Sequence, residues 1–508
     1  MIHLIHNDNH LLYQKIYINR IQCAWYRSYW YMLCIFTSTM VAILSGIIVG
    51  APASYIIAQL LLGLSVHVSF GLLSNRPLFN PVQATVVVFY WWFGVAPTIS
   101  GLFKHSIGRA EEALSAQACG VEAIFIVVLG LPLYAIASDF ALSRLRKVGW
   151  SARFLLPSGK VYKVRTVLCF AGLSLISTLL LSMLNFLGIR GMETTSYLGG
   201  IRTTIWWVGI IANVAAISSF ANSALMVALV QPKYSVPRSI KWLSAVVLLQ
   251  SVLSAVSSGS KAGFFHLALY ALFAYVSVRQ RIPWVILIAM LCLYLFVVEP
   301  FVTYARHESE LANISTVSER QSIFKRVARE GIYVQHKSLS DLNVESLFRG
   351  IYPLAGEITR ESSSFEGEWK GYTISWGISS LLPRVLNPEK RDMNIGNFFY
   401  RTVYARVYMT PTTSDTNNVS ISIPFEVVGN YGWISGVLSF ALLGIVWSSV
   451  VGWFLTPARL SSHPLVPMFI SLTLGFEQPI GHWLAALRGL IIPVFILWLV
   501  SRRLGGRL

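Results

Sequence analysis

Long apolar runs recur through most of the 508 residues, and they limit the possible folds more than any other feature of the sequence. A helix needs about 20 predominantly apolar residues to cross a hydrocarbon core roughly 30 Å thick. With 55% hydrophobic and only 12% charged residues, the chain is typical of an all-α polytopic membrane protein. Twelve runs are candidate transmembrane helices: 30–50, 54–74, 82–103, 118–141, 166–189, 204–230, 242–258, 262–278, 283–304, 432–454, 464–480 and 483–500.

Lysine and arginine residues are concentrated in alternate connections between these runs. The connection 142–165 alone holds seven of them, whereas each short connection on the opposite side holds at most two. Cytoplasmic connections carry the excess of positive charge in membrane proteins, so both termini are expected in the cytoplasm. This orientation divides the chain into a cytoplasmic N-terminal arm at 1–29, nine helices at 30–304, one large outer segment at 305–423, and three helices with a basic tail at 424–508.

The formal net charge of +18 does not by itself indicate nucleic-acid binding. No basic helix or aromatic RNA-binding signature accompanies the charge, and cytoplasmic cations account for it. The five cysteines form no CxxC pair, so neither a disulfide framework nor a thiolate metal site is predicted. The outer segment has no HExxH or aspartate-x-aspartate pattern, and the chain has no glycine-rich phosphate loop. The sequence therefore predicts no metal, no other cofactor and no ATP-driven transport.

One basic stretch stands out in the outer segment, "PRVLNPEKRDMNIGNFFYR" at 383–401. An arginine side chain can donate two parallel hydrogen bonds to a phosphate group and stays charged at any working pH. Clustered cations of this kind suit a diphosphate ester. The alternative is a solvated segment whose cations pair with its own carboxylates or with lipid phosphates. The candidate phosphate ligands are Arg384, Lys390 and Arg391, with Arg349 and Arg360 upstream.

Several ionisable residues lie in or beside the apolar runs. A charged side chain at membrane depth is costly, so each such residue is a candidate for function. Interfacial anchoring is the alternative for Lys261, Asp139 and Arg488, which fall near predicted helix ends. The candidates are Glu122, Asp139, Lys261 in "SSGSKAGFF", Glu299, Glu426 in "PFEVVGNYGW", Glu477 in "GFEQPIGHW", and Arg488.

Four stretches occur in an order that resembles a known family. They are "SSGSKAGFF", "GYTISWGISSLLPRVLNPEK", "IGNFF" and "SISIPFEVVGNYGWISGVLSFALLG". Together they resemble the oligosaccharide repeat-unit polymerases, the Wzy-type O-antigen and exopolysaccharide polymerases of bacteria. The resemblance covers residues 255–450, and the N-terminal half is similar only in being polytopic. Two departures are Met393 with Asn394 after "PEKRD", and Tyr431 where phenylalanine is common; neither removes a charge.

The resemblance implies a GT-C-like helical fold and metal-independent glycosyl transfer on the outer face of the bacterial inner membrane. The growing glycan would leave its undecaprenyl diphosphate and join a hydroxyl of the next lipid-linked repeat unit. The implied partners are this lipid-linked donor and acceptor, membrane lipids and a chain-length regulator protein, with no nucleic acid. The implied catalytic residues are Arg384, Glu368 and His307, with Glu366 and Glu299 left open as other candidates for the general base. The implied substrate-binding residues are Lys261, Arg349, Arg360, Lys390, Arg391, Asn397, Glu426 and Asn430.

Other functions are compatible with a polytopic chain that carries buried charges. A secondary transporter or lipid-oligosaccharide flippase, an O-antigen-type ligase, and a scaffold in an export complex are the alternatives. Transporters often contain internal repeats with broken helices near the membrane midplane. No repeat is visible in this sequence, and the outer segment is long, which favours an enzyme with an external site.

Overall fold

The computed structural model describes residues 32–73, 80–106, 108, 110–148, 164–186, 217–230, 237–257, 261–279, 283–293, 351–360, 369–379, 381–382, 398–404, 421–454, 466–477 and 479–489, with a few positions between 298 and 329. These residues form helices and turns and no strand. Five of the helices are long and apolar enough to cross a membrane, and they correspond to the predicted runs 30–50, 54–74, 82–103, 118–141 and 432–454. The chain is therefore an all-α membrane protein, as predicted.

The N-terminal helices form a tight antiparallel start to the fold. Helix Met32–Val49 turns at Gly50, whose φ of 77° suits glycine, and α2 (Ala53–Leu72) begins after Pro52. Asn80 caps the next helix, α3 (Pro81–Tyr90), because its side chain accepts a hydrogen bond from the backbone N–H of Gln83 at 2.8 Å. Pro81 at the first helical position completes this start.

A π-helical turn interrupts the third apolar helix. Residues Trp91–Val95 form η1, between α3 and α4 (Ala96–Ser106), so the predicted run 82–103 is helical but not uniformly α-helical. A π-turn leaves backbone groups out of the regular pattern, and these need partners in an apolar environment. The side chain of Gln59 on α2 donates to the carbonyl oxygen of Phe93 at 2.9 Å. The ring of Phe93 lies 5.2 Å from that of Phe425.

Two long helices, α5 (Ala110–Val148) and α22 (Ile423–Phe454), pack along each other through glycines. A Cβ atom added at Gly130 would lie 2.2 Å from Phe440, and one at Gly444 would lie 2.6 Å from the carbonyl oxygen of Tyr134. Further along, Gly452 faces Leu145. Glycines allow such close approach of helices in membranes.

The register of these contacts shows the direction of the two helices. Residues later in α5 contact residues later in α22. The two helices therefore run parallel. The predicted orientation also takes both helices from the outer to the inner face. Parallel helices require an odd number of membrane crossings between them. The first helices described after α5 are α6 (Val164–Phe186), α9 (Ile217–Val230), α10 (Arg238–Ser257), α11 (Lys261–Arg279) and α12 (Trp284–Leu293), and helices of the segment 305–423 follow them before α22.

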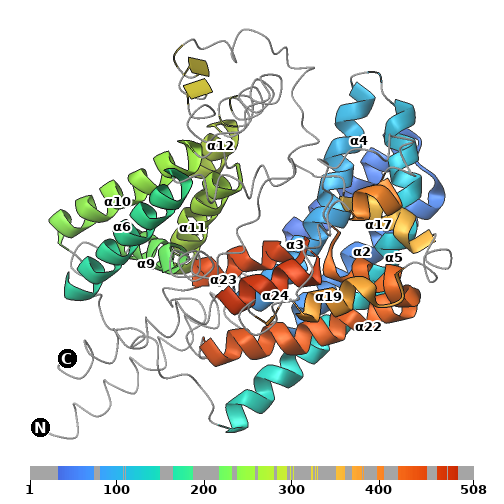
Figure 1. Ribbon diagram of the computed structural model, residues 1–508. Helices are drawn as coiled ribbons and strands as arrows, with labels where there is room; N and C mark the ends of the chain where they lie inside the picture. Colours follow the sequence, from blue (N-terminus) through green and yellow to red (C-terminus); the bar gives the residue numbers. More distant parts are fainter. Residues whose placement is uncertain are drawn as a thin grey trace, which may run out of the picture.

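These five helices, which are drawn in green in Figure 1, form a group beside the N-terminal helices, which are drawn in blue. Buried polar side chains join three of them. The hydroxyl of Ser174 on α6 donates to Asn222 on α9 at 2.6 Å, and Asn222 donates to Ser251 on α10 at 3.4 Å. Such bonds connect helices where apolar packing alone gives little preference. Helix α23 (Val466–Thr473) contacts this group and α3, and the N–H of Met468 donates to Ser223 at 3.3 Å.

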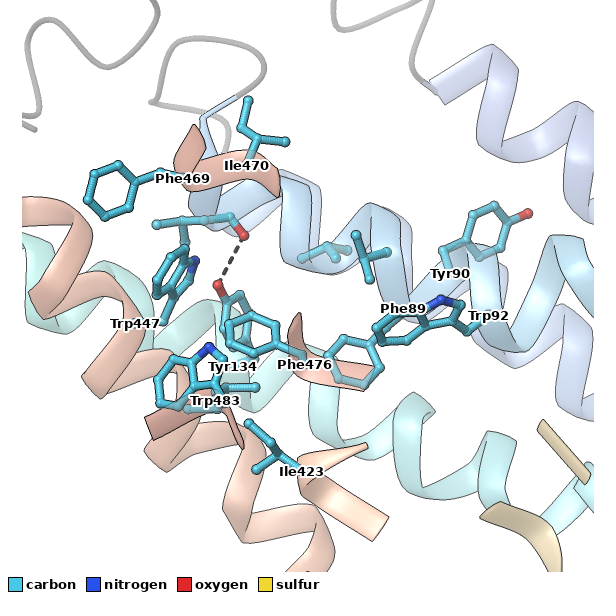
Figure 2. Close-up of a cluster of buried hydrophobic side chains, with 14 of the residues drawn as sticks. Phe89, Tyr90, Trp92, Tyr134, Ile423, Trp447, Phe469, Ile470, Phe476 and Trp483 are labelled. Carbon is cyan, nitrogen blue, oxygen red and sulfur yellow. Dashed lines mark hydrogen bonds between the residues drawn. The ribbon is translucent and has the colours of Figure 1, made fainter. Parts of the chain in front are cut away.

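An aromatic cluster holds the C-terminal helices against α22, as Figure 2 shows. The ring of Trp447 lies within 5.5–6.2 Å of Phe469, Phe476 and Trp483, which belong to α23, η7 (Leu474–Glu477) and α24 (Ile480–Gly489). The indole N–H of Trp447 also donates to the carbonyl oxygen of Pro81 at 3.3 Å. This cluster fixes where α24 begins relative to α22.

One predicted helix boundary was wrong, and another coincides with a kink inside a longer helix. The predicted run 464–480 is divided, because α23 ends at Thr473 and α24 begins at Ile480, just after Pro479. Proline has no N–H and cannot continue a preceding helix. At the other boundary, α22 extends from Ile423 to Phe454, but the predicted start at 432 coincides with a kink between two helical segments. Gly432 bends α22 with φ 81° and ψ 173°, a conformation that only glycine adopts easily.

Candidate functional site

Three helices that are distant in sequence meet at the start of α22. They are α22 itself, α19 (Tyr372–Ser379) from the outer segment, and α24 near the C-terminus. The side-chain amide of Asn430 donates to the hydroxyl of Thr373 on α19 at 2.7 Å. The carboxyl Oε2 of Glu426 accepts from the backbone N–H of Ile480, the first residue of α24, at 2.6 Å. We call this arrangement the three-helix junction.

The first turns of α22 place both junction side chains on one face. Glu426 and Asn430 are four residues apart, which brings side chains together on a helix. Glu426 is 0% exposed and Asn430 is 3% exposed. Asn430 also donates to the carbonyl oxygen of Glu426 at 2.7 Å, and the hydroxyl of Thr373 faces the Glu426 carboxyl. Both side chains are thus directed into protein contacts.

Aromatic rings pack beside the junction. Trp369, which precedes α19, is fully buried, and its ring lies 5.2 Å from Phe399 and 5.7 Å from Phe398. A Cβ atom at Gly429 would lie 2.0 Å from the Trp369 ring, so only glycine leaves room for the indole at this position. The ring of Tyr372 also lies 6.2 Å from Phe398.

These contacts place the described residues on either side of 383–397, most of the basic stretch that the sequence analysis identified. At one end, α19 closes with a turn in which the N–H of Leu382 donates to the carbonyl oxygen of Ser379 at 3.2 Å. At the other end, Phe398 packs against Trp369 and Tyr372. Leu382 and Phe398, the described residues on either side of 383–397, therefore lie at the end and at the start of α19.

Arg360 ends α17 (Ile351–Arg360), which packs against α5 and α22. Its guanidinium lies 3.3 Å from Glu357 on the same helix and 3.9 Å from Glu122 on α5. About half of the Arg360 side chain is exposed, so each pair contributes roughly 0–1 kcal/mol. The predicted phosphate ligand Arg360 thus contacts carboxylates in this structure, one of them the predicted candidate Glu122.

The remaining predicted site residues are placed only in part. Lys261 is the first residue of α11. Asp139 is half-buried on α5, and Arg401 is exposed on η5 (Tyr400–Tyr404). The roles of the other predicted residues stay predictions because these residues lie outside the described part of the chain: Glu299, His307, Arg349, Glu366, Glu368, Arg384, Lys390, Arg391 and Asn397.

The structure adds residues to the site that sequence reasoning missed. Thr373 and the N–H of Ile480 are uncharged, and neither was a candidate. One signal could have indicated Ile480. A helix that follows a proline has N–H groups in its first turn that need acceptors, and "EQPIGHW" offers no side-chain cap at Pro479. A distant carboxylate was therefore to be expected, although not which one.

The Thr373–Asn430 bond gives a testable prediction. Replacing Thr373 by Val keeps the shape of the side chain but leaves a buried amide N–H of Asn430 without its acceptor. We expect a loss of about 1–3 kcal/mol in the free energy of unfolding, measured as a lower thermal midpoint of the purified protein. Thr359→Val is the matched control, because the Thr359 hydroxyl bonds only within its own helix, to Ala355. Equal midpoints for the two variants would show that the bond adds no stability.

Comparisons with protein-family models, curated proteins and solved structures find no match for this chain. The site is therefore described by its own geometry: a buried junction of α19, α22 and α24.

Proposed function

We propose that this protein polymerises undecaprenyl-diphosphate-linked oligosaccharide repeat units into O-antigen or exopolysaccharide. In this proposal it is a polytopic glycosyltransferase of the bacterial inner membrane with about twelve transmembrane helices and a GT-C-like arrangement. Both termini are cytoplasmic, and the reaction takes place on the outer face. The grounds are the ordered resemblance of residues 255–450 and the geometry of the three-helix junction.

One observation carries the proposal furthest. The two longest stretches that resemble the polymerases, "GYTISWGISSLLPRVLNPEK" and "SISIPFEVVGNYGW", are in direct contact through the Thr373–Asn430 bond. The described residues that flank 383–397, Leu382 and Phe398, lie at the two ends of α19. A shared site requires that the stretches that resemble the family also meet in space, and these two do. A solvated loop would need no such contact.

The contact between α17 and α5 supports an outer site. Glu122, near the start of α5, pairs with Arg360 of the outer segment. At the other end of α5 lie Arg144, Arg146 and Lys147, which belong to the basic connection expected in the cytoplasm. The outer-segment helices and the most basic connection are thus separated by the length of a membrane-spanning helix.

The chemistry follows from the residues. When the glycan leaves its lipid, the bond between the anomeric carbon and the diphosphate oxygen breaks, and negative charge develops on the diphosphate. Arg384, Lys390 and Arg391 would stabilise that charge with fixed donors. The acceptor hydroxyl forms the new bond to the anomeric carbon and gives its proton to a base, for which the candidates are Glu368, His307, Glu366 and Glu299. Holding two lipid-tethered substrates together supplies further rate enhancement.

Glu426 and Asn430 have a supporting role in this proposal. Both were expected to bind substrate, but their burial and their bonds to Ile480 and Thr373 favour positioning of α24 and α19. Because α19 leads directly into the basic stretch, a displaced α19 would displace the cations with it. The catalytic geometry then depends on residues that never contact the glycan.

Inactivating the gene tests the proposed function against its alternatives. We expect long glycan chains to disappear, while single lipid-linked repeat units persist on the outer face, because polymerisation alone is lost. Expression of the intact protein restores the long chains. Repeat units trapped on the inner face would indicate a flippase. Long chains that remain attached to lipid would indicate a ligase. Lipid-linked sugars are assigned to a face by their access to an impermeant glycosidase.

A further inference from the structure

The three-helix junction contains more buried hydrogen-bond acceptors than donors. Glu426 Oε2 accepts from the N–H of Ile480, but Glu426 Oε1 has no hydrogen-bond partner. One turn further along α22, Oδ1 of Asn430 also lacks a partner, and one turn back the hydroxyl of Ser422 lacks one too. All three residues are at most 3% exposed. Carboxylate and amide oxygens can only accept, and the Ser422 hydroxyl is the one donor among these three unpaired groups, so the unpaired acceptors outnumber the donors.

No cationic side chain compensates Glu426 among the described residues. On α19 the one titratable side chain is Tyr372, which is exposed, as is Lys370 just before the helix. On α24, His482 is exposed, and Arg488 lies eight residues beyond Ile480, about 12 Å along the helix.

On α22 and α17 the titratable groups near the junction are directed elsewhere. Tyr431 on α22 is exposed, and its hydroxyl faces Gly371. On α17, Glu357 and Arg360 pair with each other. The carboxyl of Glu426 therefore has one backbone N–H and the Thr373 hydroxyl as its polar surroundings.

We propose that Glu426 is a proton-binding site: in the folded, membrane-embedded protein its carboxyl carries a proton and is a neutral acid. A neutral carboxyl accepts from Ile480 with one oxygen and donates with the other, which supplies the donor that the surrounding acceptors lack. An ionised carboxylate without a cation is strongly disfavoured in a buried apolar site. A proton is also small enough to occupy a site that has no exposed surface.

Loss of this proton would loosen the junction. The ionised carboxylate would draw water or a cation toward it, and the contacts of α22 with α24 and α19 would open together, because Glu426 and Asn430 share Thr373. A rise in pH on the side of the membrane where the junction lies is therefore expected to release the start of α24. This inference does not depend on the glycosyl transfer proposed above, since it concerns the folded chain alone.

Reaction with a hydrophobic carbodiimide tests the proton directly. Dicyclohexylcarbodiimide adds the O–H of a protonated carboxyl across one C=N bond, and the product rearranges to a stable N-acylurea, whereas ionised carboxylates do not react. The full-length protein in vesicles is treated at about pH 7, near which ordinary glutamates are ionised, and its peptides are identified by mass spectrometry. We expect the adduct on Glu426 and none on Glu122, whose side chain is half-exposed and ion-paired. Protection by sodium chloride but not by choline chloride would assign the site to a metal cation and overturn the proposal.

Hydrogen exchange provides a second test that does not require the reagent to reach the site. Glu426→Gln keeps a neutral side chain with one acceptor and a donor group. Amide exchange at residues 480–483 is measured for both proteins between about pH 6 and pH 9, and is normalised to α2 residues 58–66 of the same sample. We expect the protection of these amides in the wild-type protein to fall by at least about tenfold relative to the Gln variant as pH rises. Parallel pH profiles for the two proteins would show that deprotonation of Glu426 does not weaken the start of α24 between these pH values. Parallel profiles without any adduct on Glu426 would overturn the proposal.

Discussion

Replacing Arg384 by Ala is expected to abolish long glycan chains while single repeat units persist and the protein still accumulates in the membrane. Under the proposed function Arg384 donates hydrogen bonds to the leaving diphosphate. Removing one preorganised donor of this kind typically costs about 3–4 kcal/mol in the transition state, a hundredfold or more in rate. The chain-length distribution of the glycan, resolved by electrophoresis, is the measurement.

Two further variants make this result specific. Arg384→Lys is expected to restore little polymer, because a point charge cannot form two parallel hydrogen bonds to phosphate oxygens. Arg238→Ala is the control, since Arg238 is exposed at the start of α10, on the expected cytoplasmic side. A solvated basic stretch would lose at most about 1 kcal/mol of stability in the Arg384→Ala protein. Normal long chains in that protein would contradict the phosphate role and favour the transporter or scaffold.

Replacing Gly444 by Ala is expected to cause a large loss of stability. The added Cβ would lie 2.6 Å from the carbonyl oxygen of Tyr134 and 3.2 Å from the Cβ of Ala137, so α22 and α5 would have to separate. Overpacking of this kind costs about 1–3 kcal/mol. Gly452→Ala should cost less, because it meets only side-chain ends of Leu142 and Leu145, which can move. The thermal midpoint of the detergent-solubilised protein measures both effects.

Gly172→Ala is the matched control for this pair. Gly172 lies within α6, and an added Cβ meets nothing within 4 Å. Alanine is the better helix former by up to about 1 kcal/mol, so this variant should be neutral or slightly more stable. If Gly444→Ala were as stable as Gly172→Ala, the close parallel packing of α5 and α22 would be incorrect.

Much of the helical layout could be predicted from the sequence, because apolar length alone identifies a membrane helix. Which face of each helix packs could not. In a bilayer both the packed face and the lipid face are apolar, so Ile47 and Leu44 are exposed on a helix whose buried residues include Ile35 and Val49. The π-turn at 91–95 gave no apolar signal either, because it changes the backbone rather than the hydropathy.

The candidate site was predictable in its charged half. Glu426 was identified because an ionisable side chain near an apolar run is conspicuous, and Asn430 because it lies in "PFEVVGNYGW", part of a stretch that resembles the polymerases. Their partners were not, since Thr373 is uncharged and the N–H of Ile480 belongs to the backbone, which has no sequence signature. These partners lie more than 50 residues away along the chain. Only the fold brings the two halves of the junction together.

The parallel pairing of α5 and α22 also has a consequence for biosynthesis. Ile423 follows Val148 by 275 residues. At about 5–20 residues per second, the ribosome needs roughly 14 to 55 s to complete this interval. During that time the face of α5 that carries Gly130 is already synthesised but its native partner is not. A chaperone, the insertion machinery or lipid must cover Gly130 and its neighbours until α22 arrives, and any earlier helix with small residues on one face can compete for the same groove.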